Sequence, residues 1–201
     1  MTVTSTTTTT RLEFPRGAQR LTVRVEAGMP ALHRARFGGP RPTVHEADGT
    51  LTIDYPRLAT SGFPGLARRS ADITLDPRVA WDLALGGVSR MSGDLRGLDL
   101  RSLEIAGGVS GLDLELPAPR GVVPLRIRGG ARAVTLRLGA GTAARLLIGG
   151  GASRIAFDDQ QFGAVGGGLR LQTNDADAAE DRFEIDVEGG ASGLTVVRGV
   201  D

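Results

Sequence analysis

The sequence predicts an all-β protein, a β-solenoid in which the chain winds once per repeat around an aliphatic interior. Three observations predict this fold: a recurring glycine doublet, strict alternation of aliphatic and polar residues between the doublets, and the composition. Glycine supplies 30 of 201 residues, about twice its usual share, whereas one Trp, one Tyr and six Phe are the only aromatic residues. Short aliphatic strands joined by frequent turns account for both features, because glycine is favoured where a chain turns.

The first segment, residues 1–10, is almost entirely Thr and Ser, and we expect it to be a disordered tail. It lacks the basic start and apolar run of a secretory signal. No stretch of the sequence approaches 18 apolar residues, so we expect no transmembrane segment. We therefore expect a cytoplasmic protein, and export by an unrecognised route stays open.

Residues 11–80 contain strands that do not follow the repeat. Residues 11–14 and 21–25 alternate as strands do, and residues 43–55 read as a hairpin around the turn Ala47-Asp48-Gly49. Residues 71–75 form a further strand that leads into Trp81. No Gly/Pro-rich linker follows, so we expect residues 11–201 to be a single β-solenoid domain. We interpret 11–80 as irregular first coils that also close one end of the stack.

Residues 81–201 carry the regular repeat, whose pattern is Gly-Gly, a small aliphatic residue, usually Ser, any residue, and an aliphatic residue. The doublets are Gly86-Gly87, Gly107-Gly108, Gly129-Gly130, Gly150-Gly151 and Gly189-Gly190. They start 21, 22, 21 and 39 residues apart, so the last interval fits two units. This spacing predicts one coil of the chain per doublet, with the doublet at a corner where a Cβ is not tolerated.

Between the doublets the aliphatic residues point to one side. Residues 112–116, Leu-Asp-Leu-Glu-Leu, put three leucines on one face and two carboxylates on the other, and residues 125–128, 134–138 and 183–187 repeat the scheme. A period near 21 residues suits three short faces per coil, with successive coils about 4.8 Å apart. Each inward aliphatic side chain then contributes about 1.5–3 kcal/mol through burial.

The hairpin at 44–55, the segment from Asp72 to Trp81 and the Gly-Gly-Val/Ala-Ser repeats resemble the bacterial putative-adhesin, or toast-rack, domain family, over roughly residues 11–201. That family is similar to the C-terminal domain of LiaF-type envelope-stress proteins. The resemblance implies a right-handed, single-stranded β-helix-like stack that acts as an interaction or sensing module, and it implies no catalytic residues. Relatives are often joined to membrane segments, and this sequence departs from them because it shows none.

Composition excludes several kinds of chemistry. All 24 basic residues are Arg, so no Schiff-base or phosphate-loop lysine is present. Cysteine is absent, which excludes disulfides, thiolate metal sites and cysteine nucleophiles. The net charge of +1 gives no global attraction to nucleic acid. We expect no cofactor and no nucleic-acid partner.

Four patterns could carry chemistry, and for each we favour a structural interpretation. The Gly-x-Gly-x-x-Ala match at residues 139–144 has strand and turn after it where a dinucleotide site needs a helix. His33 and His45, the only histidines, have no partner at metal-ligand spacing. The acidic residues 174–181 could bind Ca²⁺ but lack the pattern of a calcium loop, and read better as a solvated excursion.

The fourth pattern is a set of carboxylates, Asp158 and Asp159 with Glu184 and Asp186, that could serve a carbohydrate-active β-helix enzyme. Solvated surface positions are the favoured interpretation for them. The scarcity of aromatic platforms also argues against an enzyme that cleaves glycans.

Outward arginines follow Asp113 and Glu115 by one coil or more. Cross-coil ion pairs are the favoured interpretation, each worth about 0–1 kcal/mol at the surface. The alternative is an interaction strip for phosphate, anionic lipid or an acidic partner. The arginines of this strip are Arg126, Arg128, Arg132, Arg137 and Arg145.

These observations predict a non-enzymatic scaffold or interaction module whose surface engages protein partners or other copies of the chain. End stacking of identical coils would give homo-oligomers, and a link to envelope stress or signalling follows from the resemblance alone. The alternatives are the carbohydrate-active enzyme and an exported adhesin.

Overall fold

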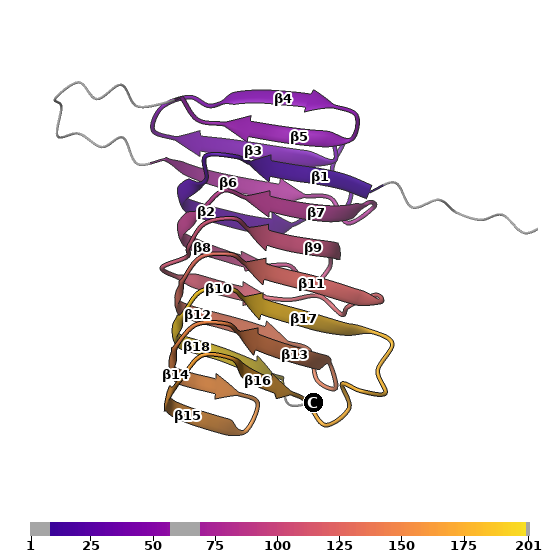
Figure 1. Ribbon diagram of the computed structural model, residues 1–201. Helices are drawn as coiled ribbons and strands as arrows, with labels where there is room; N and C mark the ends of the chain where they lie inside the picture. The colour runs from indigo at the N-terminus through magenta and orange to yellow at the C-terminus, as the bar shows by residue number, and fades with distance from the viewer. Residues whose placement is uncertain (1–8, 57–68, 200–201) are drawn as a thin grey trace, which may run out of the picture.

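The computed structural model describes residues 9–56 and 69–199, which form two nine-stranded mixed β-sheets facing each other across one core (Figure 1). Within these ranges every regular element is a strand, so the predicted all-β class is confirmed. The described part of the chain holds no apolar helix of the length needed to cross a bilayer.

The order of the strands across each sheet differs from their order in the chain. The first sheet runs β16 (Leu169–Gln172), β13 (Ala143–Ile148), β17 (Arg182–Val187), β11 (Val122–Ile127), β9 (Asp99–Ile105), β7 (Ala80–Leu85), β1 (Thr9–Phe14), β5 (Thr50–Asp54) and β4 (Thr43–Ala47). The second runs β15 (Gln160–Val165), β14 (Ala152–Phe157), β18 (Ala191–Arg198), β12 (Ala131–Leu138), β10 (Leu112–Glu115), β8 (Val88–Asp94), β2 (Ala18–Val25), β6 (Ser70–Leu75) and β3 (His33–Gly38).

Each repeat contributes one strand to each sheet. The chain passes along β7, turns through a glycine doublet, returns along β8 and turns again into β9, which pairs with β7 in parallel. The prediction of three short faces per coil is therefore wrong, since a coil has two. The physical reason is strand length: most of these strands run six to eight residues, so two of them with the doublet and one turn fill a 21-residue period.

The core consists of rows of aliphatic side chains stacked in register from coil to coil. One row in the first sheet comprises Leu51, Leu12, Leu83, Leu103, Leu125, Ile185 and Leu146. The facing row in the second sheet comprises Leu21, Met91, Leu112, Val134, Leu194 and Ile155. Every member of both rows is at most 3 % exposed. The period-two alternation of the sequence thus places its aliphatic residues inside, as predicted.

Both ends of the stack are closed by a pair of strands that run against the rest. At one end β3 and β4 lie antiparallel to β6 and β5, and at the other β15 and β16 lie antiparallel to β14 and β13. The predicted hairpin at residues 43–55 is confirmed as β4 and β5, with Asp48 and Gly49 at φ of 50° and 72° in its turn. Thr9 and Thr10 already belong to β1, and the rest of the predicted tail lies outside the described residues.

After each end pair the chain inserts its next coil back into the stack. The coil β5–β6 enters between the end pair and β1–β2, and β17–β18 enters between β11–β12 and β13–β14. Figure 1 shows β17 and β18, the last strands of the chain, lying between earlier ones. The interval of 39 residues between the last two doublets therefore holds the reversed strands β15 and β16 as well as β17.

Candidate functional site

The glycine doublets lie at one corner of the molecule, where the chain passes from the first sheet to the second. Their first glycines pack directly on the backbone of the neighbouring coil. A Cβ placed on Gly107 would lie 2.6 Å from the carbonyl oxygen of Gly86, and one on Gly129 would lie 2.6 Å from the nitrogen of Gly108. The inserted coil joins the same ladder, because Gly189 approaches the backbone of Gly129 equally closely.

The second glycines differ in how closely they pack. The nearest atom to a Cβ on Gly130 would be 3.6 Å away, and none would lie within 4 Å of one on Gly151. The expectation that a corner Cβ is excluded throughout the doublet is therefore wrong for Gly87, Gly130 and Gly151, whereas a Cβ on Gly108 or Gly190 would lie only 3.0 or 2.9 Å from a backbone oxygen of the neighbouring coil. Because the corner carries no side chains at its glycines, it presents a strip of bare backbone with the first residues of the second-sheet strands beside it.

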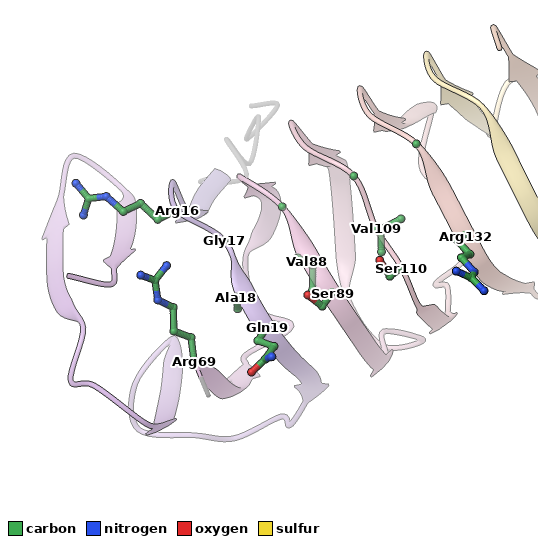
Figure 2. Close-up of a pocket in the computed structure, with 13 residues that line it drawn as sticks. Arg16, Gly17, Ala18, Gln19, Arg69, Val88, Ser89, Val109, Ser110 and Arg132 are labelled. Atoms are coloured by element: carbon green, nitrogen blue, oxygen red, sulfur yellow. The ribbon is translucent and has the colours of Figure 1, made fainter. Parts of the chain in front are cut away.

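A shallow groove of about 590 Å³ lies along this corner. Its floor includes Gly17, Gly87, Gly108 and Gly130, one from each of four successive coils. Figure 2 shows Arg16 and Arg69 at one end of the groove and Arg132 at the other, with Ser89 and Ser110 between them. A neighbouring depression of about 450 Å³ shares Gln19, Ser89 and Ser110 and adds Arg20, Ser70 and Arg90. We call the two depressions together the corner groove.

The register of the strands places these polar side chains in a row. Val88 pairs with Val109, and Val109 pairs with Ala131, and all three side chains are buried. Because side chains alternate along a strand, the next residues, Ser89, Ser110 and Arg132, point outward one coil apart. The row continues beyond the groove to Ser192 and Ser153, whose hydroxyl oxygens are 3.2 Å apart.

Arg20 and Arg90 stand directly opposite each other on the parallel strands β2 and β8. Both are exposed, and like charges at opposed positions of neighbouring strands destabilise a sheet. Within the described residues, Arg20, Arg90 and Arg132 form none of the ion pairs that most other arginines make. None of the described residues that line the two depressions is a carboxylate. The corner groove is thus a concentration of positive charge in a chain of nearly zero net charge.

The remaining two arginines of the groove are held in place by neighbouring groups. Arg16 donates to the Asp54 carboxylate at 2.6 Å and to the carbonyl of Tyr55 at 2.8 Å. Arg69 donates to the carbonyl of Pro56 at 3.0 Å, and its guanidinium lies 5.9 Å from the centre of the Tyr55 ring. Burial raises the pKa of Tyr55, and the nearby Arg69 opposes that shift. Arg16 and Arg69 therefore form a fixed end to the groove.

The predicted arginine strip is divided between two faces. Arg126 and Arg145 lie on the first sheet and Arg128 directly follows its strand β11, whereas Arg132 and Arg137 lie on the second sheet, so the five do not form one strip. Cross-coil ion pairs engage three of them. Arg128 contacts Glu104 at 2.7 Å, Arg145 contacts Asp177 at 2.7 Å, and Arg137 pairs with Asp113.

Of the arginines in the corner groove, sequence reasoning found Arg132 and missed the rest. A signal for Arg20 was present. Residues 16–21, Arg-Gly-Ala-Gln-Arg-Leu, match the repeat of residues 86–91, Gly-Gly-Val-Ser-Arg-Met, with Arg in place of the first glycine. The structure aligns the two segments, pairing Ala18 with Val88 and Leu21 with Met91. The repeat therefore begins one coil earlier than the doublets indicate.

The other sequence patterns occupy structural positions. Residues 139–142 form the turn between β12 and β13, in which the amide of Thr142 donates to the carbonyl of Gly139 at 3.2 Å, and a strand follows. His33 and His45 lie in β3 and β4, which belong to different sheets. The described residues contain no group of three or more His, Asp or Glu side chains arranged to hold a metal.

The acidic excursion at residues 174–181 is tied to the stack. Asp177 accepts from Arg145 at 2.7 Å and from Gln172 at 2.9 Å, and these two hydrogen bonds lower its pKa. A hydrogen bond from Thr173, with Arg198 nearby, lowers the pKa of Asp175. The carboxylates serve these contacts and do not converge on a common point.

The carboxylates considered for a glycan-cleaving site are also separated. Asp158 follows β14 at the second sheet and pairs with Arg198, whereas Glu184 and Asp186 lie on β17 in the first sheet. The aliphatic core lies between the two sheets. Asp158 and the β17 carboxylates therefore cannot act on one glycosidic bond from opposite sides, which overturns that grouping.

Comparison with solved structures shows a similar fold. The chain superposes on the crystal structure of a putative cell adhesion protein from Clostridium sporogenes with a TM-score of 0.70 and 19% sequence identity, over 94% of this chain and 92% of that one. A putative adhesin from Bacteroides fragilis matches with a TM-score of 0.29 and 9% identity over 94% and 91%. No protein-family model matches the chain. No curated protein sequence matches it either.

Proposed function

We propose that this chain is a non-enzymatic interaction or adhesion module built as a β-solenoid, with the corner groove as its binding surface. The observation that carries the proposal is the corner groove itself: five arginines and three serines line a solvent-facing surface, and among the described residues only Arg16 of these arginines has an ion-pair partner, Asp54. The similar fold of the putative cell adhesion protein from Clostridium sporogenes is consistent with an adhesion role.

The rest of the molecule suits a binding role. Stacked strands in continuous register hold the groove residues on a rigid frame, so little ordering of the protein is needed when a ligand binds. Conversely, the groove offers neither a nucleophile paired with a base nor two facing carboxylates among its lining residues. The sensing role and the link to LiaF-type envelope-stress proteins remain predictions from the resemblance.

The test is a binding screen with a parallel assay for turnover. The full chain would be applied to immobilised polysaccharides and to candidate surface proteins, and its retention measured. The same polysaccharides would be incubated with the chain and assayed for new reducing ends. We expect retention without turnover. Release of reducing ends above a no-protein blank would instead support the carbohydrate-active enzyme.

Self-association through the end strands is a second candidate function, and β15 favours it. This edge strand, Gln160–Val165, contains no charged residue, whereas β3, β4 and β16, at the other three sheet edges, each carry at least one. Edge strands without charges are prone to pair with further strands. Sedimentation of the purified chain over a range of concentrations should show a dimer that Gln161→Lys abolishes. A monomer throughout would exclude this association.

The cellular location of the protein is a separate question. We propose a cytoplasmic location, with export by an unrecognised route as the alternative, and fractionation of the producing cells with an antibody against the chain decides between them.

A further inference from the structure

We propose that the corner groove binds a linear anionic polysaccharide through its carboxylate or sulfate groups. This inference rests on the proposed function, because it names the ligand class of the same surface. Arg20 and Arg90 are directly opposed on adjacent strands, and none of the described residues that line their depression is a carboxylate. A bound oxyanion between the two guanidiniums would convert this repulsion into two charge-assisted contacts.

The groove has the shape of a site for an extended ligand. Its floor crosses β2, β8, β10 and β12, or three strand spacings, which is about 14 Å. Arg69 and Arg132 line its two ends, and the Arg20–Arg90 pair lies in the adjoining depression beside Ser89 and Ser110. A polymer that carries anionic groups at intervals can contact several of these positions at once, whereas a single small anion would contact one.

The chemistry of the lining favours a glycan over the other polyanions. Ser70, Ser89, Ser110 and Gln19 supply groups that both donate and accept hydrogen bonds, as sugar hydroxyls require. Among the described residues no aromatic side chain lines the groove, which disfavours single-stranded nucleic acid, because its bases bind by stacking on aromatic side chains. The groove crosses strands in the interior of the stack, so it offers no free strand edge to which an extended peptide could add.

The experiment measures binding of the full chain to defined polymers at low and high salt. Polygalacturonate supplies carboxylates, heparin supplies sulfates as well, and dextran is the uncharged control. We expect the wild-type chain to bind at least one of the two anionic polysaccharides, to ignore dextran, and to lose affinity as salt rises. Which polysaccharide binds more tightly distinguishes carboxylate from sulfate as the preferred group.

The deciding variant is Arg20→Gln/Arg90→Gln, which should weaken this binding at least about tenfold, because it removes two charge-assisted hydrogen bonds to the ligand. Arg126→Gln/Arg170→Gln is the matched control, because it removes two exposed arginines from the outer face of the first sheet. The control should bind within about twofold of the wild-type chain, once salt has screened its more distant charges.

A melting curve without ligand separates binding from folding. Because Arg20 and Arg90 repel each other, their replacement should leave the melting temperature unchanged or raise it. Equal affinities of the two double variants would overturn the proposal, as would tighter binding of single-stranded DNA or polyglutamate than of either polysaccharide. If the chain binds other surfaces in the screen and Arg20→Gln/Arg90→Gln leaves that binding intact, both the ligand and the groove assignments fail, while the proposed interaction role of the chain stands.

Discussion

At the scale of single residues, the two glycines of a doublet differ in how closely they pack on the neighbouring coil. The first lies against the backbone of a neighbouring coil in all five doublets, whereas the second faces more open space in three of them, at Gly87, Gly130 and Gly151. Gly107 and Gly151 illustrate the contrast, since a Cβ would meet backbone at 2.6 Å on Gly107 and nothing within 4 Å on Gly151. Neither has a positive φ, so sterics alone separate them. Close approach of the coils, rather than turn geometry, explains why the first position is always glycine in the five doublets.

This contrast yields a stability prediction. Gly107→Ala should lower the free energy of unfolding by about 1–3 kcal/mol, because the coils must move apart to admit the methyl group. Gly151→Ala, the matched control, should change it by less than about 0.5 kcal/mol. Urea unfolding followed by circular dichroism measures both values. Similar losses in the two variants would show that the corner is not limited by packing between coils.

A second residue-scale prediction concerns the fifth position of the repeat. Ala133 and Arg154 occupy this position with φ of 49° and 52°, where the inserted coil has Gly193 at 67°. A non-glycine residue in the left-handed backbone region costs about 1–2 kcal/mol. Replacing it with glycine removes this cost, but the greater entropy that glycine loses on folding cancels part of the gain. Ala133→Gly should therefore stabilise the protein by about 0.5–1 kcal/mol. Ala156→Gly, at a strand position without positive φ, should destabilise it, and thermal unfolding of both compares the signs.

At the scale of elements, the order of the coils is the feature that sequence spacing concealed. The strands β17 and β18 come last in the chain but lie between β11–β12 and β13–β14, paired on both sides. Their residues continue the core rows through Ile185 and Leu194, which are at most 3 % exposed. The last regular strands are therefore an interior layer, and the ends of the stack are β3 with β4 and β15 with β16.

Hydrogen exchange tests this order. Amides of β17 and β18 should exchange as slowly as those of β11 and β12, because all four strands have partners on both sides. Amides of β4 and β15 should exchange fastest among the strands, since each has one partner and exposed side chains along most of its length. Exchange measured by mass spectrometry on the native chain suffices. Fast exchange in β17 and β18 would contradict the inserted position.

At the scale of the whole molecule, arginine–aspartate contacts fasten the turns that join the coils. Asp76 is the most buried of these carboxylates: one of its oxygens accepts from the backbone nitrogen and the Nε of Arg78, at 2.9 and 2.8 Å, while its own carbonyl accepts from Trp81. These hydrogen bonds to Arg78 lower the pKa of Asp76. A hydrogen bond from Arg96 likewise lowers the pKa of Asp94, at the end of β8.

The lowered pKa values define an acid limit. A carboxyl group whose pKa is lower in the folded state than its ordinary 3.8 stabilises the fold at pH above 3.8, and this contribution disappears as pH falls through the folded value. Asp76, Asp94, Asp175 and Asp177 all shift in this direction. The melting temperature should therefore decrease when the pH is lowered below about 3.8. Asp76→Asn should reduce the stability at pH 7 and make this decrease of the melting temperature at low pH less steep. An unchanged slope in that variant would remove Asp76 from this account.

The sequence alone determined the all-β class, the inward aliphatic rows and the place of the glycine doublets at a corner of each coil. These features follow from alternation and spacing, which are local properties that each strand carries independently. Leu112 and Leu114 must share a face in any strand that contains them. The tertiary structure decided the remaining features: the number of faces in a coil, the order of the coils in the stack, and the pairing of Arg20 opposite Arg90. Residues 20 and 90 are distant in the chain, and only pairing between coils, which depends on how the ends reverse and insert, brings their charges together.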